Sequence, residues 1–460
     1  MRKKLTDILY SFPFQLLVLH LRGNLLLIGV WILLALIVTG KLGGGFGLRY
    51  LFLSPEYLGQ VGFISFFFVG VGYGGLVMSW NLTTYLLDAY RFSFLASLGK
   101  PFAKFVLNNL VVPVSFTLLF LVCQIRFGVF HELLPLGEVL WNSVGFLTGF
   151  ATLVFFLAVY FQFTNKDITS FTDKGKRKEK NPENSQVVKD IRQHRNQWRV
   201  DTFLSDGMRP RPVRSVAHYD PAFLAKIFQQ NHLNALLVQL FTLVVILLLG
   251  ALIDRPVFRI PTGASIFLLS SMVIAVGGAI SFWLGSWRIS GLVVMLFLIN
   301  FITRFDCFHH KNKAYGLNYN VPGSPYNLDS LQNSCNQAAV DSDKAVTLEI
   351  LEKWKRKATG PNGEKPKMVF FCVSGGGLKA ATWAMEVLQH ADSLTNGEFM
   401  EHTVLMSGAS GGMMGTSYYR ELALLKQEGE PINLNDQQYI ADISKDLLNP
   451  ISFTIVTNDV

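Results

Sequence analysis

Long apolar runs separated by polar segments dominate residues 1–303. About 20 apolar residues cross a bilayer as a helix, because every backbone polar group must be satisfied inside the hydrocarbon. Uncharged stretches of about this length lie at 23–40, 57–81, 105–125, 139–165, 232–253 and 260–283, and a shorter seventh run lies at 285–303. The pattern therefore predicts an α-helical membrane region of about six or seven transmembrane helices.

Two parts of this region need a more specific interpretation. Between 260 and 303 the only charged residue is Arg288. One helix over this stretch would be roughly twice as long as the hydrocarbon is thick, so we expect a hairpin of two spans that turns near Arg288. Residues 5–21 are also apolar, but Asp7 and Pro13 favour an interfacial segment over a further span.

The composition agrees with a membrane protein. Of the 460 residues, 50% are hydrophobic and only 16% are charged. Soluble globular chains carry roughly 25% charged residues, so this composition argues against an ordinary soluble enzyme and against a disordered protein. The four cysteines exclude a disulfide-dense secreted scaffold.

The formal net charge of +9 has its largest contribution in one loop. Residues 166–230 carry 14 Lys and Arg against 8 Asp and Glu, whereas residues 304–460 carry 14 against 18. Basic residues between apolar runs are typical of the cytoplasmic side of a membrane, so we expect this loop and the N terminus in the cytoplasm, and no nucleic-acid partner. Seven spans would place the C-terminal part outside the cytoplasm, which we favour, and six would keep it inside.

Residues 304–365 are interpreted as a linker or cap. The part up to 345 is rich in Asn, Pro, Gly and Tyr and predicts irregular structure, whereas 345–357 has the pattern of an amphipathic helix. Cys307 and Cys335 lie here, and two histidines are close to the first cysteine. Three interpretations stay open: two free cysteines, a disulfide between them, or a metal site built from Cys307, His309, His310 and Cys335.

The pattern changes after the linker, at residues 366–460. Met368–Val373 is a short continuous apolar run of the kind found in a parallel strand that is covered on both faces. It leads into the glycines Gly375, Gly376 and Gly377 and then into a helical stretch. A glycine turn between a strand and a helix points several N–H groups at one spot, and such a nest can hold a phosphate or a transient oxyanion.

A second strand, turn and helix follow within about 35 residues. The strand is predicted at 402–406 and the turn contains the pattern Gly408-x-Ser410-x-Gly412. This is the nucleophile-elbow pattern, in which small flanking residues let a serine occupy a strained turn with its hydroxyl exposed. The pattern alone is weak, and its strength here comes from the glycine nest that precedes it.

Two alternatives compete for the same residues. Gly375-x-Gly377-x-x-Ala380 also matches a dinucleotide-binding fingerprint, but that site requires an acidic residue at the end of a second strand, and Asp392 and Glu398 lie in a polar stretch without a strand before them. The glycines could also be ordinary tight turns of a Rossmann-like sheet. All nine histidines precede Ser410, so a triad in the order Ser, Asp, His cannot form within this chain.

The segment Ser374–Ala380 followed by Gly408–Gly412 resembles the patatin-like phospholipases, in particular the cytosolic phospholipase A2-like branch. The resemblance covers roughly residues 366–460 and implies an α/β domain with a parallel sheet that follows the membrane region along the chain. It also implies that Ser410 is the acyl nucleophile, that the three glycines at 375–377 form the oxyanion hole, and that Lys379 lies near the oxyanion loop or the substrate phosphate. No metal or organic cofactor is implied.

The chain departs from the family pattern at the second catalytic residue. In the family this residue is an Asp in an Asp-Gly motif downstream of the serine, whereas the single Asp-Gly here is Asp206-Gly207, far upstream. The domain is also short and ends in an apolar run at 451–456 that has a β-like composition. We therefore expect an incomplete domain or a truncated chain, with the catalytic Asp outside these residues.

The sequence as a whole predicts a membrane-anchored serine acyl hydrolase that cleaves ester bonds of phospholipids or other acyl lipids. Its partners would be the bilayer and that lipid substrate, and the oligomeric state is left open. The alternative is a membrane protein whose appended domain binds a lipid or another anion at the glycine nest without turnover.

Overall fold

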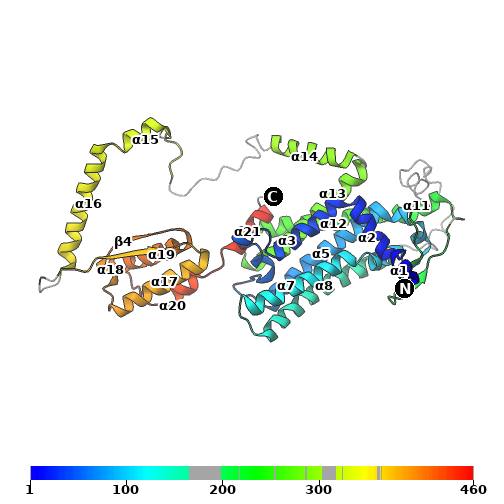
Figure 1. The fold of residues 1–460 in the computed structure, drawn as a ribbon, viewed down its shortest axis with the longest axis horizontal. Helices are drawn as coiled ribbons and strands as arrows, with labels where there is room; N and C mark the ends of the chain where they lie inside the picture. The colour runs from blue at the N-terminus through cyan, green and yellow to red at the C-terminus, as the bar shows by residue number, and fades with distance from the viewer. Residues whose placement is uncertain are drawn as a thin grey trace. The chain divides into compact units, whose positions relative to one another are not determined.

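The computed structural model describes the chain except for residues 1, 165–197, 217, 230, 253–254, 285–286, 303–316, 324, 360–362, 364 and 459–460. The described residues are mostly helical, with two small two-stranded sheets (Figure 1). They form two compact units. Unit 1 comprises Met1–Thr303 and Leu448–Val460, and unit 2 comprises Arg304–Leu447.

Unit 1 is a helical bundle with one short hairpin. Its α-helices are α1 (Arg2–Leu9), α2 (Phe12–Gly23), α3 (Leu25–Val38), α4 (Tyr50–Leu53), α5 (Phe63–Asp88), α6 (Pro101–Asn108), α7 (Val111–Phe130), α8 (Leu136–Thr164), α11 (Pro221–Gln229), α12 (Asn231–Ala251), α13 (Thr262–Leu284), α14 (Arg288–Ile302) and α21 (Leu448–Asn458). Short 3-10 helices include η2 (Ala89–Arg91) and η3 (Ser93–Ser97). The hairpin pairs β1 (Thr202–Leu204) with β2 (Pro210–Pro212).

Four helices of unit 1 are long and apolar enough to cross a membrane: Phe63–Arg91, Val111–Phe130, Leu136–Thr164 and Thr262–Leu284. The count over the described residues rises to five if α2 and α3 together form one broken span. These two helices are bent by 97° relative to each other. The apolar helices Leu237–Ala251 and Ile289–Ile302 are shorter. A multi-span membrane protein is therefore compatible with the fold.

Several predicted boundaries were wrong. The run at 57–81 forms a helix that begins at Phe63 and continues to Asp88, and the run at 105–125 begins at Val111. The interfacial segment and the first predicted span instead form the bent pair α2 and α3. The bend lies at Asn24, whose backbone (φ −119°, ψ 39°) is not helical, and Gly and Asn both have low helix propensity.

Small residues bring α5 and α8 into direct backbone contact. Gly70 and Gly74 face α8, and Gly145 and Gly149 face α5, so each helix contributes a small-xxx-small pair. A Cβ atom at Gly70 would overlap the Phe146 carbonyl oxygen. Close approach of this kind, rather than apolar burial against lipid, is what holds helices together inside a bilayer.

The predicted basic loop 166–230 is folded in part. Residues 165–197 lie outside the described residues, but the β1–β2 hairpin packs Phe203 into the apolar cluster of α2, α6 and η3. The exposed Asp206 at the hairpin turn forms an ion pair with Lys104 of α6. Asn108 of α6 also donates to the Leu204 carbonyl oxygen (3.0 Å), so the hairpin is fixed to this helix.

The β-like interpretation of residues 451–456 was wrong, because they form the helix α21 of unit 1. Phe453 is buried, and the helix packs against α12 and α13. Asn449 anchors its first turn, accepting from Thr262 N (2.7 Å) through its side chain and from Thr262 Oγ1 (2.7 Å) through its carbonyl oxygen. Tertiary packing thus overrides the strand preference of the β-branched residues.

Unit 2 contains a two-stranded parallel sheet with helices. Its elements are α15 (Leu328–Ser334), α16 (Gln337–Ala358), β3 (Val369–Val373), α17 (Gly377–Leu394), α18 (Phe399–His402), β4 (Thr403–Gly408), α19 (Ser410–Gln427) and α20 (Gln437–Ile443). The prediction of irregular structure up to 345 was therefore wrong for α15 and the start of α16, whereas the amphipathic helix at 345–357 is confirmed as part of α16.

The helices α17 and α19 pack on one face of the sheet around a core that contains Met385, Leu388 and Tyr419. The other face is open, since Phe370 is 56% exposed and Leu405 is 51% exposed. The prediction of a strand covered on both faces is therefore wrong for the described residues. An apolar strand in the sequence does not show whether a second layer lies over it.

Candidate active site

The parallel pairing of β3 and β4 brings the two predicted turns together. Val373 pairs with Gly408, so both strands end at the same edge of the sheet, where the glycine turn and the serine turn begin. The Ala409 N–H donates to the Val373 carbonyl oxygen (3.3 Å). A Cβ atom at Gly375 would lie 3.2 Å from Ser410 Cβ and 3.9 Å from its Oγ, so the backbone of the glycine turn lies against the serine side chain.

Ser410 has the backbone of a strained elbow. Its φ is +49°, in the left-handed region that side chains other than glycine rarely adopt, and it is the first residue of α19. Ala409 before it is extended (φ −136°, ψ 151°), which makes the turn from strand to helix sharp. The serine is exposed. Such strain is typical of sites where a side chain must be held in one direction for function.

The glycine turn presents its N–H groups at the start of α17. Gly377 has φ +62°, which favours glycine, and its helix begins at this residue. The first N–H groups of a helix have no intrahelical partner. No hydrogen bond among the described residues engages the N–H of Gly375 or Gly376. The turn therefore has free donors next to Ser410, at the end of a helix where partial positive charge favours an anion.

The remaining glycines of the two turns have packing roles. A Cβ atom at Gly408 would overlap the Val373 carbonyl oxygen, and one at Gly412 would overlap that of Ser374. Gly411 and Gly415 were not identified from the sequence as packing residues, although both are buried where α19 meets α17. Their four-residue spacing, which puts small residues on one face of a helix, is the pattern that could have indicated this contact. These contacts fix the position of Ser410 relative to the glycine turn.

The strain at Ser410 gives a prediction about stability. We expect Ser410→Gly to raise the free energy of unfolding of the α19 region by about 1 kcal/mol relative to Ser410→Ala, because only glycine relieves the positive φ. Hydrogen exchange of the α17 and α19 amides in the full chain measures this difference. Equal protection in the two variants would show that the backbone of residue 410 is not strained.

Lys379 and the acidic residues do not complete a catalytic set at Ser410. Lys379 is exposed in the first turn of α17. No hydrogen bond joins Ser410 Oγ to a His, Asp or Glu side chain within the part of the chain that the structure describes. Asp392, on α17, is buried beside Tyr419; burial, followed by the charge of this carboxylate, raises the pKa of the Tyr419 phenol well above its usual value. Both groups therefore belong to the core of unit 2.

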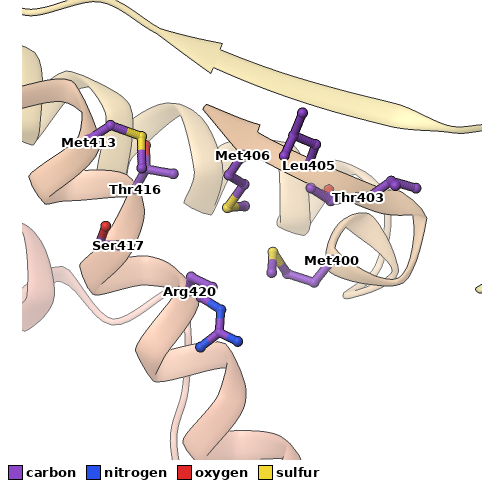
Figure 2. A pocket seen from close by; sticks show the side chains of 9 residues that line it. Met400, Thr403, Leu405, Met406, Met413, Thr416, Ser417 and Arg420 are labelled. Atoms are coloured by element: carbon purple, nitrogen blue, oxygen red, sulfur yellow. The ribbon is translucent and has the colours of Figure 1, made fainter. Parts of the chain in front are cut away.

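A hollow of about 270 Å³ lies between α18, β4 and the part of α19 from Met413 to Arg420 (Figure 2). It is lined by Met400 of α18, Thr403, Val404, Leu405 and Met406 of β4, and Met413, Thr416, Ser417 and Arg420 of α19. Methionine side chains adapt to apolar groups of irregular shape. The exposed Arg420 adds a positive charge to this otherwise mainly apolar lining, so the hollow is suited to an amphiphilic group.

The other candidate sites gain no support. Asp392 lies in α17 and Glu398 precedes α18, so neither acidic residue follows a strand as a dinucleotide site requires. Cys335 is an exposed free cysteine, and Cys307, His309 and His310 lie outside the described residues, so the disulfide stays a prediction. No group of three or more metal-ligating side chains occurs among the residues described.

Comparisons with known proteins do not assign the chain. No protein-family model, no curated protein and no solved structure matches it.

Proposed function

We propose that unit 2 is the nucleophile-bearing part of a serine acyl hydrolase that acts on membrane lipids. The observation that carries this proposal is the strained, exposed Ser410 lying against the glycine turn. A serine hydroxyl attacks an ester carbonyl best when N–H donors stand where the oxyanion develops. The resemblance of these two turns to the patatin-like phospholipases supports the same assignment.

In the proposed reaction Ser410 Oγ bonds to the ester carbonyl carbon and the carbonyl oxygen becomes the oxyanion. The N–H groups of Gly375, Gly376 and Gly377 stabilise this charge, a contribution that is about 3 kcal/mol per donor in serine hydrolases. The alcohol part of the lipid then leaves and the acyl group stays on the serine until water removes it. The hydroxyl proton passes to a carboxylate, which the resemblance places downstream of Ser410.

A lipid substrate fits three features of the chain. Unit 1 has helices apolar enough to hold the protein in a bilayer, where acyl lipids are concentrated. The hollow between β4 and α19, the helix that begins at Ser410, is lined by methionines and by Leu405. Arg420 and Lys379 are exposed cations on α19 and α17, the two helices that follow the serine turn and the glycine turn. Cations at these positions would attract the phosphate of a phospholipid head group.

A fluorophosphonate probe tests this proposal, because it phosphonylates activated serines. We expect the full-length protein in detergent to be labelled and Ser410→Ala to lose essentially all labelling. Ser393→Ala is the matched control, since this exposed serine lies in the last turn of α17, outside both turns and the hollow, and it should be labelled like the wild type. A wild type that stays unlabelled, or labelling of Ser410→Ala at the wild-type level, would contradict the proposal.

A second function, anion binding without turnover, is favoured by one observation. Ser410 Oγ has no acid or base side chain bonded to it among the described residues, whereas the N–H groups of the glycine turn are free. In that case the protein would bind vesicles that contain phosphatidic acid and would leave the probe unreacted. Labelling of Ser410 would rule this alternative out.

A further inference from the structure

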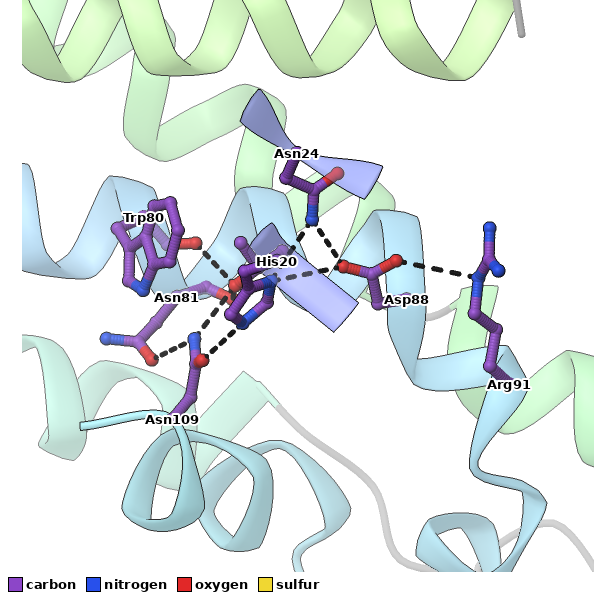
Figure 3. Close-up of polar contacts among 8 residues, drawn as sticks. His20, Asn24, Trp80, Asn81, Asp88, Arg91 and Asn109 are labelled. Carbon is purple, nitrogen blue, oxygen red and sulfur yellow. Dashed lines mark hydrogen bonds and ion pairs between the residues drawn. The ribbon is translucent and has the colours of Figure 1, made fainter. Parts of the chain in front are cut away.

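A buried polar cluster lies in unit 1 at the break between α2 and α3 (Figure 3). Its members are nearly inaccessible to solvent: His20, Asn24, Asn81, Thr84, Asp88 and Asn109 are each at most 7% exposed. They come from α2, the α2–α3 break, α5 and the residue that follows α6. Ionisable side chains inside an apolar helical bundle are costly, and where they occur they generally have a function.

The hydrogen bonds fix the proton on one ring nitrogen of His20. The Asn81 amide nitrogen donates to the Val77 carbonyl oxygen (2.8 Å), so the Asn81 side-chain oxygen faces Asn109. The Asn109 amide nitrogen donates to that oxygen (3.0 Å), which leaves the Asn109 oxygen facing His20 Nε2 (2.7 Å). An amide oxygen only accepts, so His20 Nε2 must carry a hydrogen.

The other ring nitrogen of His20, Nδ1, faces both Asn24 and Asp88. The Asn24 amide nitrogen lies 3.1 Å from Nδ1 and donates to Asp88 Oδ2 (2.6 Å). Nδ1 lies 3.5 Å from the same carboxylate oxygen. In the neutral ring Nδ1 accepts a hydrogen bond from Asn24. In the charged ring Nδ1 instead donates towards Asp88, and Asn24 keeps the carboxylate as its acceptor.

One charged side chain, Asp88 of α5, faces the His20 ring, and a second, Arg91 of η2, faces Asp88. Arg91 Nε lies 3.6 Å from Asp88 Oδ1. Of the other charged side chains that the structure describes on α2 and the elements packed against it, Asp7, Arg22 and Arg126 are exposed, Lys104 pairs with Asp206, and Asp201 pairs with Arg199. With Arg91 balancing Asp88, the neutral ring leaves the cluster without net charge, and one added proton makes it positive.

We propose that His20, Asn24 and Asp88 form a proton-binding site of unit 1. One proton from water bonds to the lone pair of His20 Nδ1, and the imidazolium is stabilised by the Asp88 carboxylate. The bond from Asn24 to the ring is lost in the same step. Because Asn24 is the residue at which α2 ends and α3 begins, proton uptake changes the hydrogen bonding of the break itself. Broken helices with polar groups at the break are a common setting for ion and proton sites in membranes.

Nitrogen-15 magnetic resonance of the full-length protein, labelled at histidine and reconstituted in phosphatidylcholine liposomes, tests this site. Bare and protonated ring nitrogens resonate far apart, and His20→Gln identifies the signals of His20. We expect Nε2 to be protonated throughout, and Nδ1 to change from bare to protonated as the pH of the sample is lowered. An Nδ1 that stays bare down to the lowest pH at which the protein remains folded, or a ring with a bare Nε2 and a protonated Nδ1, would overturn the proposal.

Asp88→Asn separates the role of the carboxylate from that of the histidine. The variant removes the negative charge with little change of shape, so less of the ring should be doubly protonated than in the wild type at the same pH, because a buried cation without a partner is costly. Glu138→Gln, an exposed carboxylate at the start of α8, is the matched control and should behave like the wild type. Equal protonation of His20 in Asp88→Asn would contradict the proposal, and if that variant does not fold the wild-type spectra decide alone.

Discussion

Replacing Gly411 by valine is expected to unfold the α17–α19 part of unit 2 and to abolish reaction at Ser410. A Cβ atom at this position would overlap the carbonyl oxygen of Gly377, the residue at which the glycine turn becomes α17. Backbone cannot move aside as a flexible side chain can. We therefore expect a loss of more than about 3 kcal/mol, since overpacking against side chains alone already costs about 1–3 kcal/mol.

Hydrogen exchange of the α17 and α19 amides, measured in the full chain, checks this loss. Met414→Val is the matched control, because Met414 lies on the same helix, is 47% exposed and carries the same helix penalty for a β-branched residue. Gly411→Val with wild-type protection would show that α17 and α19 are not in backbone contact. Protection that is lost equally in both variants would show that helix propensity, not packing, is responsible.

The second large effect is expected at Gly149, where α8 meets α5. A leucine side chain there would overlap the Phe67 carbonyl oxygen and force the two helices apart. Helix pairs in membranes depend on this close approach, because lipid gives no apolar driving force between them. We expect the midpoint of thermal unfolding in detergent to fall by roughly 5 °C or more, which corresponds to a loss of about 2 kcal/mol.

The neighbouring residue provides the control for this change. Thr148→Leu adds the same side chain on the exposed surface of α8 and should leave the midpoint within about 2 °C of the wild type. If Gly149→Leu unfolds at the wild-type temperature, the small residues of α5 and α8 do not form the contact that holds them together. If both variants lose stability equally, the position within α8 does not matter and the packing argument is wrong.

The sequence was sufficient to predict the two strand-turn-helix elements of unit 2. The reason is that glycines between an apolar run and a helical pattern are a local signal, so the turn at Gly375–Gly377 and the elbow at Ser410 could be placed to the residue. Their proximity followed from parallel pairing, since the ends of parallel strands meet at one edge. The sequence did not show that the second face of the sheet is open in the described residues. The reason is that a short apolar strand has the same composition whether helices cover one face of its sheet or both.

Non-local contacts explain the predictions that were wrong. The run at 451–456 was expected to be β-like because it is rich in β-branched residues, yet Phe453 is buried in a helix that is anchored by Asn449 to Thr262. The buried cluster around His20 joins residues up to 89 positions apart, and no spacing along the chain reveals it. Helix boundaries such as the start of α5 depend on where neighbouring helices take over hydrogen bonds and packing, not on hydropathy alone.

The residue that carries a covalent fluorophosphonate adduct is the most direct measure of the central claim that Ser410 is an acyl nucleophile. Full-length protein treated with the probe is digested, and mass spectrometry locates the added phosphonyl group. The account predicts that the group is on Ser410, and that prior acylation by a slowly hydrolysed lipid ester blocks its addition. An adduct on another residue, or no adduct on folded protein, would contradict it.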